Sequence, residues 1–225
     1  MLNSGFASAY HIFVKKKRKI IVFLAARGAL CYNTVQMSNC KGRGEAMARP
    51  NSKWYRLDNA GILYSALQKE EYSAIYRFSA LMEKDVDPAA LQRAIDRCMP
   101  RFPSFAVRIR KGLFWYYLEP NHASGPFLKE DVSDPCQPVR FREDNGWLVR
   151  FYYYRERISV EVFHALSDGG GAIVFFRTLL AEYLRQTGVD VPAGNGVLDL
   201  NEPPREEELE DAYARYAGRH AFGLQ

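Results

Sequence analysis

The residues best suited to chemistry lie in one short segment of the chain, 163–171, whose sequence is FHALSDGGG. His164 follows a predicted strand, so that one of its ring nitrogens can face a cavity, and Asp168 lies four residues later in the same turn. An imidazole has an ordinary pKa of about 6.5, which suits proton transfer near neutral pH when its tautomer is held. Gly169 allows a left-handed backbone or the close approach of another group. The segment therefore predicts a general-base site.

Other chemistries fit this segment less well. His164 and Asp168 supply only two metal ligands and the sequence places no third, so we predict no metal site. Ser167 lacks the G-x-S-x-G elbow of serine hydrolases. The glycine run has neither the G-x-G-x-x-G pattern nor the lysine of a nucleotide-binding loop. A lone H-x-x-x-D pair also arises by chance among structural and surface residues, so a non-catalytic role stays open.

The elements that position the segment indicate an α+β domain. On the strand that leads into it, Ile158, Val160 and Val162 share one face while Ser159 and Glu161 share the other. This strand forms a hairpin with a preceding one, and a second hairpin turns at Lys111-Gly112. Strands are expected over 72–82, 105–110, 113–118, 147–154 and 158–163. Hairpins with segregated helices favour an α+β sandwich over a doubly wound parallel sheet.

Other sequence patterns predict where the helices begin and end. Asp87-Pro88 is a cap followed by a proline at the first helical position, and Leu91, Ala94, Ile95 and Cys98 continue as an apolar stripe. The glycine run leads into an apolar helix over 172–186, and a Gly/Pro-rich linker is expected over 188–204. Further helices are expected over 59–67 and 205–216.

Composition limits the possible classes of protein. The chain has 225 residues, 48% of them hydrophobic and 25% charged, which is typical of a globular domain and not of a disordered chain. No apolar run approaches the roughly 18 residues of a membrane span. The four cysteines have no C-x-x-C spacing, so we expect free thiols in a reducing compartment and a cytoplasmic protein.

The basic charge is concentrated at the N-terminus. Residues 1–46 hold eight of the 31 Lys and Arg and one of the 26 acidic residues, which leaves 23 basic and 25 acidic residues over 47–225. The net charge of +5 therefore does not argue for a nucleic-acid partner. The basic run 15–19 and the apolar run 20–26 have the outline of a signal peptide, and a nuclear signal or an anionic-lipid patch are alternatives. We favour a simpler interpretation, in which translation starts at Met47 and residues 1–46 are an atypical extension that is not translated.

Segment 163–171 resembles the H-H-x-x-x-D-G signature of the CoA-dependent acyltransferase superfamily, which includes chloramphenicol acetyltransferase, peptide-synthetase condensation domains and alcohol acetyltransferases. Residues 87–107 look like the helix and strand of condensation-type N-terminal lobes, with Arg101-Phe102-Pro103-Ser104-Phe105 where these families carry an Arg-His-x-x-Leu-like element. Residues 54–218 look most like the alcohol acetyltransferase branch. Phe163 replaces the first histidine of the motif, which many single-histidine members also lack.

The resemblance implies a chloramphenicol acetyltransferase-like two-layer sandwich. His164 would be the base that deprotonates an alcohol or amine as it attacks acyl-CoA or an acyl-carrier thioester, the co-substrate, with no bound cofactor. Asp168 would be structural and pair with a cation, with Arg101 the preferred partner. Gly169 would keep room for substrate.

The resemblance also implies that a lobe is missing. Members of the superfamily have two similar lobes, and the D-F-G-W-G-like element of the second does not occur in this sequence. We therefore expect an N-terminal lobe over 47–218 with a tail over 219–225, from a truncated gene or a split enzyme. It would act with a second-lobe polypeptide or as a homodimer. The alternative is a non-catalytic remnant or binding module.

Overall fold

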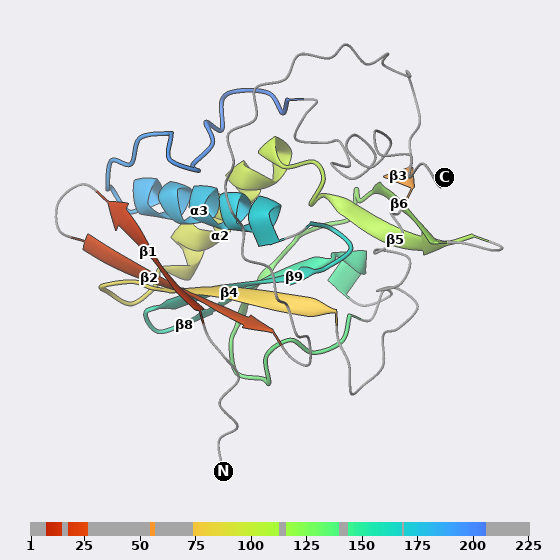
Figure 1. Ribbon diagram of the computed structural model, residues 1–225, viewed down its shortest axis with the longest axis horizontal. Coiled ribbons are helices and arrows are strands. Elements are labelled where there is room, and N and C mark those ends of the chain that lie inside the picture. The colour runs from red at the N-terminus through yellow and green to blue at the C-terminus, as the bar shows by residue number, and fades with distance from the viewer. Residues whose placement is uncertain are drawn as a thin grey trace, which may run out of the picture.

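The protein is built around a six-stranded sheet (Figure 1). The computed structural model describes residues 8–14, 18–26, 55–56, 74–112, 116–139, 144–167 and 169–205. The sheet has the order β1-β2-β4-β9-β8-β7, and its neighbouring strands are antiparallel except for the parallel pair β7 and β8. Its strands are β1 (Ser8–Val14), β2 (Arg18–Ala26), β4 (Ile75–Leu81), β7 (Leu128–Glu130), β8 (Val149–Tyr154) and β9 (Arg157–Phe163).

A second, three-stranded sheet has the order β3-β6-β5 and is antiparallel throughout. Its strands are β3 (Tyr55–Arg56), β5 (Val107–Lys111) and β6 (Tyr116–Pro120). The hairpin expected around Lys111-Gly112 joins β5 to β6, since Lys111 pairs with Tyr116. A small core connects this sheet to the end of the large one, where Ile109 packs in one cluster with Ile75 and Phe163.

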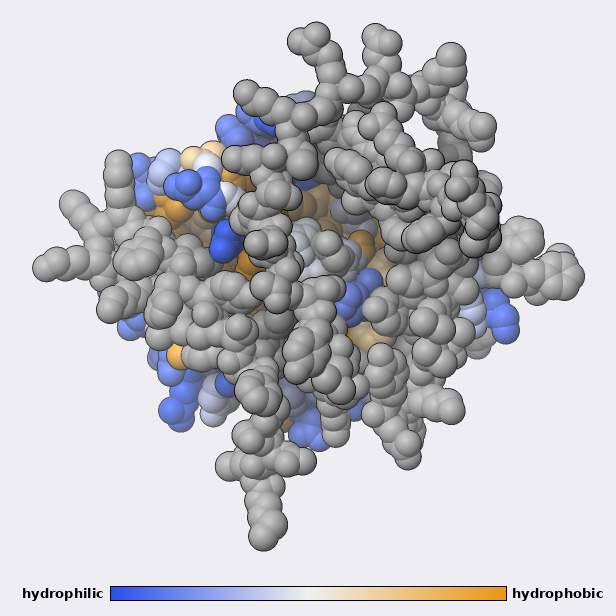
Figure 2. Space-filling view, in the orientation of Figure 1, coloured by the Kyte–Doolittle hydropathy of each residue, from blue (hydrophilic) through white to orange (hydrophobic). Residues whose placement is uncertain are grey.

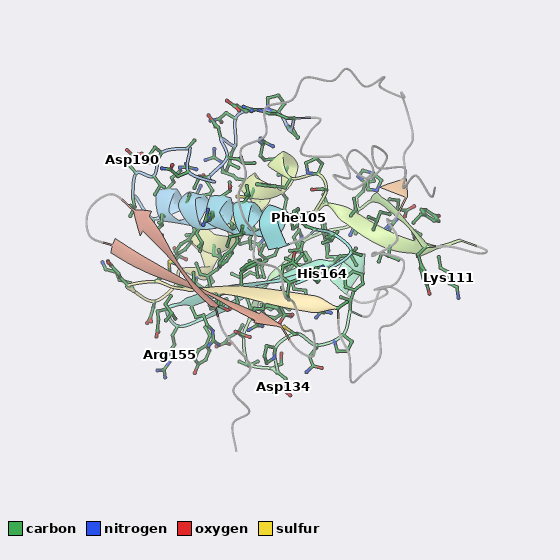
Figure 3. The ribbon with its side chains drawn as sticks, in the orientation of Figure 1. Phe105, Lys111, Asp134, Arg155, His164 and Asp190 are labelled. Carbon is green, nitrogen blue, oxygen red and sulfur yellow. The ribbon has the colours of Figure 1, made fainter. Side chains whose placement is uncertain are left out.

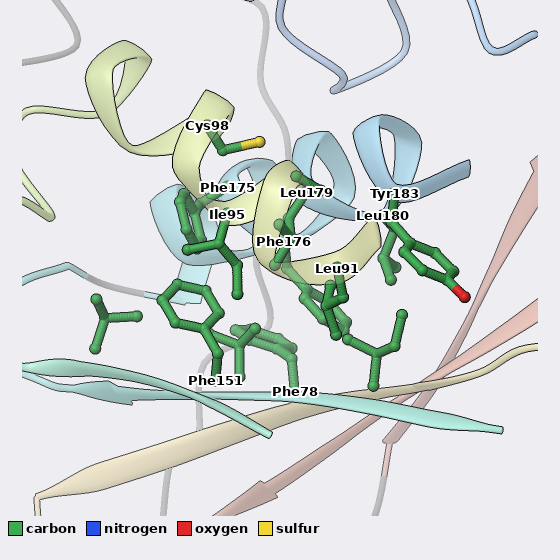
Figure 4. Close-up of a cluster of buried hydrophobic side chains, with 14 of the residues drawn as sticks. Phe78, Leu91, Ile95, Cys98, Phe151, Phe175, Phe176, Leu179, Leu180 and Tyr183 are labelled. Atoms are coloured by element: carbon green, nitrogen blue, oxygen red, sulfur yellow. The ribbon is translucent and has the colours of Figure 1, made fainter. Parts of the chain in front are cut away.

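Helices α2 (Pro88–Cys98) and α3 (Gly169–Gln186) cover one face of the large sheet (Figure 1). Phe78 of β4 stacks on Phe176 of α3 at a centroid distance of 5.8 Å. Figure 4 shows the core between helices and sheet, in which Phe151, Phe175 and Leu179 are almost fully buried. Each such side chain stabilises the fold by about 1.5–3 kcal/mol relative to its exposure. The two-layer α+β sandwich predicted from the sequence is confirmed.

The sequence signals at the start of α2 are also confirmed. The Asp87 carboxylate accepts hydrogen bonds from the backbone N–H groups of Ala89 at 2.9 Å and Ala90 at 3.2 Å. Pro88 occupies the first turn, where no intrahelical donor is needed. The apolar stripe of α2 is buried, and a short 3-10 helix η1 (Met99–Arg101) follows it.

The opposite face of the sheet carries charge, although it is covered. Arg77 of β4 donates to both carboxylate oxygens of Asp131, at 2.8 and 3.1 Å, and to Glu161 of β9 at 2.9 Å. Residues 131–139 cross this face, and the Cys136 backbone N–H also donates to Glu161. Arg150 of β8 holds the same segment by donating to the carbonyl of Gln137. The alternation along β9 is as predicted, but its polar face is buried, because another segment of the chain covers it.

Some elements differ from the sequence prediction. Strand β7 has no counterpart among the strands expected from the sequence. Helix α3 starts at Gly169, three residues before the expected start. The apolar run 20–26 belongs to β2, which pairs with β4 over 21–26 and 76–81. The helix expected over 59–67 lies outside the described residues, as does all but residue 205 of the helix expected over 205–216. Among the described residues, no helix combines the length and the apolar character of a membrane span.

The predicted linker 188–204 is irregular, as expected, but it packs along α3. Thr178 of α3 accepts a hydrogen bond from the backbone of Leu198 at 3.0 Å, and Arg185 donates to the carbonyl of Val191 at 2.7 Å. Leu198 and Leu200 add to the main core. The stretch is therefore part of the packed domain.

Candidate functional site

His164 lies where β9 ends and the chain turns toward α3 (Figure 3). Its backbone N–H donates to the carbonyl of Ala74 at 2.8 Å, which extends the pairing of β9 with β4 by one residue. On the other side of β9, the Phe163 N–H donates to the carbonyl of Leu148 at 3.0 Å. The backbone that carries His164 is therefore fixed by both neighbouring strands.

The turn that follows His164 is held by a side chain of β4. The Leu166 N–H donates to the carbonyl of Phe163 at 2.9 Å, which closes the turn. The Tyr76 hydroxyl donates to the carbonyl of Ser167 at 2.9 Å. Helix α3 begins two residues later, so the turn is anchored at its far end as well.

His164 is half-buried, so that it is partly accessible from outside the domain. It packs against the Tyr76 ring with a centroid distance of 4.8 Å and an interplanar angle of 64°. Tyr76 in turn packs edge to face on Phe78 in the core. A chain of aromatic contacts thus connects the histidine to the body of the domain.

Gly169 differs in part from the expectation. It is exposed at the start of α3 and does not have a left-handed backbone. A β-carbon placed on it would meet no described atom within 4 Å. The described residues therefore leave open space beside Gly169.

Arg101 is buried in η1, with 3% of its surface exposed. Its Nε donates to the carbonyl of Asp199 at 3.2 Å, and its guanidinium lies 5.9 Å from the ring centre of Phe102. Asp168 lies outside the described residues, so the pairing of Arg101 with Asp168 stays a prediction. The bond to Asp199 joins the end of α2 to the segment that follows α3.

Two further observations bear on the site. Over the described ranges no cluster of His, Cys, Asp and Glu could hold a metal ion. A cavity of about 260 Å³ lies at the edge of the sheet near β7 and β8, and none of the predicted site residues lines it; its lining is Pro126, Phe127, Lys129, Asn145, Trp147, Val149 and Arg150.

Tyr76 is the residue of the site that sequence reasoning missed. Within its strand it reads as one more core aromatic, and it is indeed buried. No local pattern could reveal its hydrogen bond, since Ser167 is 91 residues away along the chain. Only the adjacency of β4 and β9 brings the two together.

Comparison with known proteins identifies the fold. No protein-family model and no curated protein matches the sequence. Among solved structures, the complex of the X-domain and OxyB from teicoplanin biosynthesis matches with a TM-score of 0.54 and 16% identity over 69% of this chain and 38% of that chain. The starter condensation domain of rhizomide synthetase RzmA matches with a TM-score of 0.51 and 14% identity over 64% of this chain and 41% of that chain.

The chain therefore has the condensation-domain fold, which is the chloramphenicol acetyltransferase-like fold that the motif predicted. It spans about two fifths of the length of the structures it matches. That share corresponds to a single lobe, as the sequence also predicted.

Proposed function

We propose that the protein is the N-terminal lobe of an acyltransferase, in which His164 accepts a proton from the attacking alcohol or amine. The observation that carries the proposal is the position of His164. It is half-buried at the end of β9, on a turn fixed by β4 and β8, with open space at Gly169. The condensation-domain fold supports the same assignment, because segment 163–171 resembles the signature of the superfamily that includes condensation domains.

The proposed reaction transfers an acyl group from a thioester, either acyl-CoA or an acyl-carrier protein. His164 takes the proton of the acceptor O–H or N–H as that atom attacks the thioester carbonyl. A C–O or C–N bond forms, the C–S bond breaks, and the departing sulfur takes the proton back from the imidazolium to leave a free thiol. General-base catalysis of this kind contributes about 10²–10⁴-fold to turnover.

We propose structural roles for the other predicted site residues, which would hold the turn in place and leave room for the substrate. We propose that Asp168 pairs with Arg101 and thereby ties the turn to the end of α2, because the resemblance implies that this aspartate pairs with a cation and Arg101 is a buried one. Gly169 would leave room for the substrate beside the turn. A second lobe, supplied as a separate polypeptide or by a second copy of this chain, would complete the substrate tunnel.

The test is an assay of thioester cleavage with a thiol reagent, over a panel of acyl-CoA donors with alcohols and amines, for the chain alone and with an added second-lobe polypeptide. His164→Ala should lower turnover by about 10²–10⁴-fold and change stability little, because its ring is only half-buried. The matched control is His122→Ala, since His122 is exposed in a loop. Full activity in His164→Ala would refute the assignment.

A second candidate function is a protein-binding module without catalysis. The observation that favours it is that one chain of the same fold comes from the complex of an X-domain with another protein, OxyB. Absence of thioester cleavage in every reconstituted form, together with stable binding to a protein partner, would support this candidate over the first.

A further inference from the structure

We infer that Tyr76 is a positioning residue for His164; this rests on the proposed function and extends it to a residue outside the motif. Tyr76 is in the second position of β4, and its backbone pairs with Val162 of β9, two residues before His164. Its side chain is 4% exposed. It thus approaches the turn after β9 from the neighbouring strand and from within the core.

Tyr76 makes two different contacts with this turn. Its hydroxyl donates to the carbonyl of Ser167 at 2.9 Å, and its ring packs against the His164 ring at 4.8 Å. The hydroxyl therefore fixes the far end of the turn, while the ring limits the directions in which the imidazole can point. A base that is displaced by about 1 Å can lose a large part of its effect, so both contacts matter for proton transfer.

The backbone of β4 provides the third contact. The carbonyl of Ala74 accepts the hydrogen bond of the His164 N–H at 2.8 Å. Ala74 and Tyr76 are two residues apart, so one short stretch of β4 holds the turn at His164 and again at Ser167. The turn is therefore held at two points by a single strand. The edge-to-face contact of Tyr76 with Phe78 in turn fixes Tyr76 against the core.

Two variants separate the contacts. Tyr76→Phe removes the hydrogen bond to Ser167 and keeps the ring, while Tyr76→Leu removes both. A hydrogen bond of this kind is worth about 1 kcal/mol, which corresponds to about a fivefold change in rate. We expect kcat to fall about two- to tenfold in Tyr76→Phe and further in Tyr76→Leu. KM should be nearly unchanged, because Tyr76 is buried and would act through His164.

The matched control is Tyr183→Phe. Tyr183 is also 4% exposed, and its hydroxyl accepts a hydrogen bond from a backbone N–H, that of Asp87, at 3.1 Å. It lies at the other end of α3, away from His164. A general loss of stability would affect both tyrosine variants, whereas loss of positioning would affect only Tyr76→Phe.

A measurement that does not depend on activity is NMR of the imidazole signals in the full chain, isotope-labelled at histidine. The signals that are absent from His164→Ala are those of His164. We expect Tyr76→Phe to shift the His164 ring signals and Tyr183→Phe to leave them unchanged. Unchanged His164 signals in Tyr76→Phe, or shifted signals with wild-type kcat, would overturn the inference. Wild-type turnover in His164→Ala would instead refute the proposed function, and the two failures are therefore distinguishable.

Discussion

Replacement of Arg77 by methionine tests whether the charged face of the sheet holds the fold together. The guanidinium donates to Asp131 with two-pronged geometry and to Glu161, and all three side chains are less than 10% exposed. Burial disfavours the charged guanidinium, but the two carboxylates outweigh this, so that the pKa of Arg77 is raised above its ordinary value. Methionine keeps much of the length of the side chain and removes only the charge and the donors.

The expected loss in the free energy of unfolding depends on which cations still neutralise Asp131 and Glu161 after the substitution. Removal of one partner from a buried ion pair typically costs about 3–5 kcal/mol, because a buried charge is left uncompensated. Here Arg157 still contacts Asp131 at 2.9 Å, and Arg150 lies 3.5 Å from Glu161. We therefore expect Arg77→Met to lower the free energy of unfolding by an amount at the lower end of this range, about 3 kcal/mol. That is a large part of the roughly 5–15 kcal/mol that stabilises an ordinary domain.

The assay is urea unfolding followed by tryptophan fluorescence and circular dichroism, with Arg108→Met as the control. Arg108 also pairs with a carboxylate across neighbouring strands, that of Glu119 at 2.7 Å, but both side chains are partly exposed. An exposed pair contributes about 0–1 kcal/mol, so the control should lose little. If the two variants lose the same free energy of unfolding to within about 0.5 kcal/mol, the assigned role of the buried network is wrong.

Two further changes test local features of the fold. Asp87→Ala should lower the free energy of unfolding by about 1 kcal/mol, because two N–H groups of α2 lose their cap. Asp85→Ala, at an exposed position nearby, should change it little, and equal losses in the two variants would contradict the capping role. Burial, with a smaller effect of Glu161, raises the pKa of Tyr152 to about 12, so its contribution to stability is complete below about pH 10 and is lost as the pH rises through about 12. Unfolding curves at pH 8 and pH 11 should therefore show a smaller alkaline loss in Tyr152→Phe than in the unchanged chain, and the same loss in both would contradict this.

The sequence was sufficient wherever structure depends on near neighbours along the chain. The cap at Asp87, the two hairpins and the alternation on β9 follow from contacts a few residues apart, and all are present. The end of β9 could also be located from that alternation, which placed His164 at the end of a strand. The motif around it led to the fold of the lobe, which the solved structures confirm.

Tertiary structure alone decided which distant segments became neighbours. Glu161 lies on the polar face of an alternating strand, yet it is buried, because residues 131–139 cross that face and Arg77 supplies the opposite charge. Strand β7 is too short to give a periodic signal and exists through its pairing with β8. The contact of Tyr76 with the His164 turn depends on the adjacency of β4 and β9. Such contacts join residues tens of positions apart, and their energies depend on strand order, which local patterns do not encode.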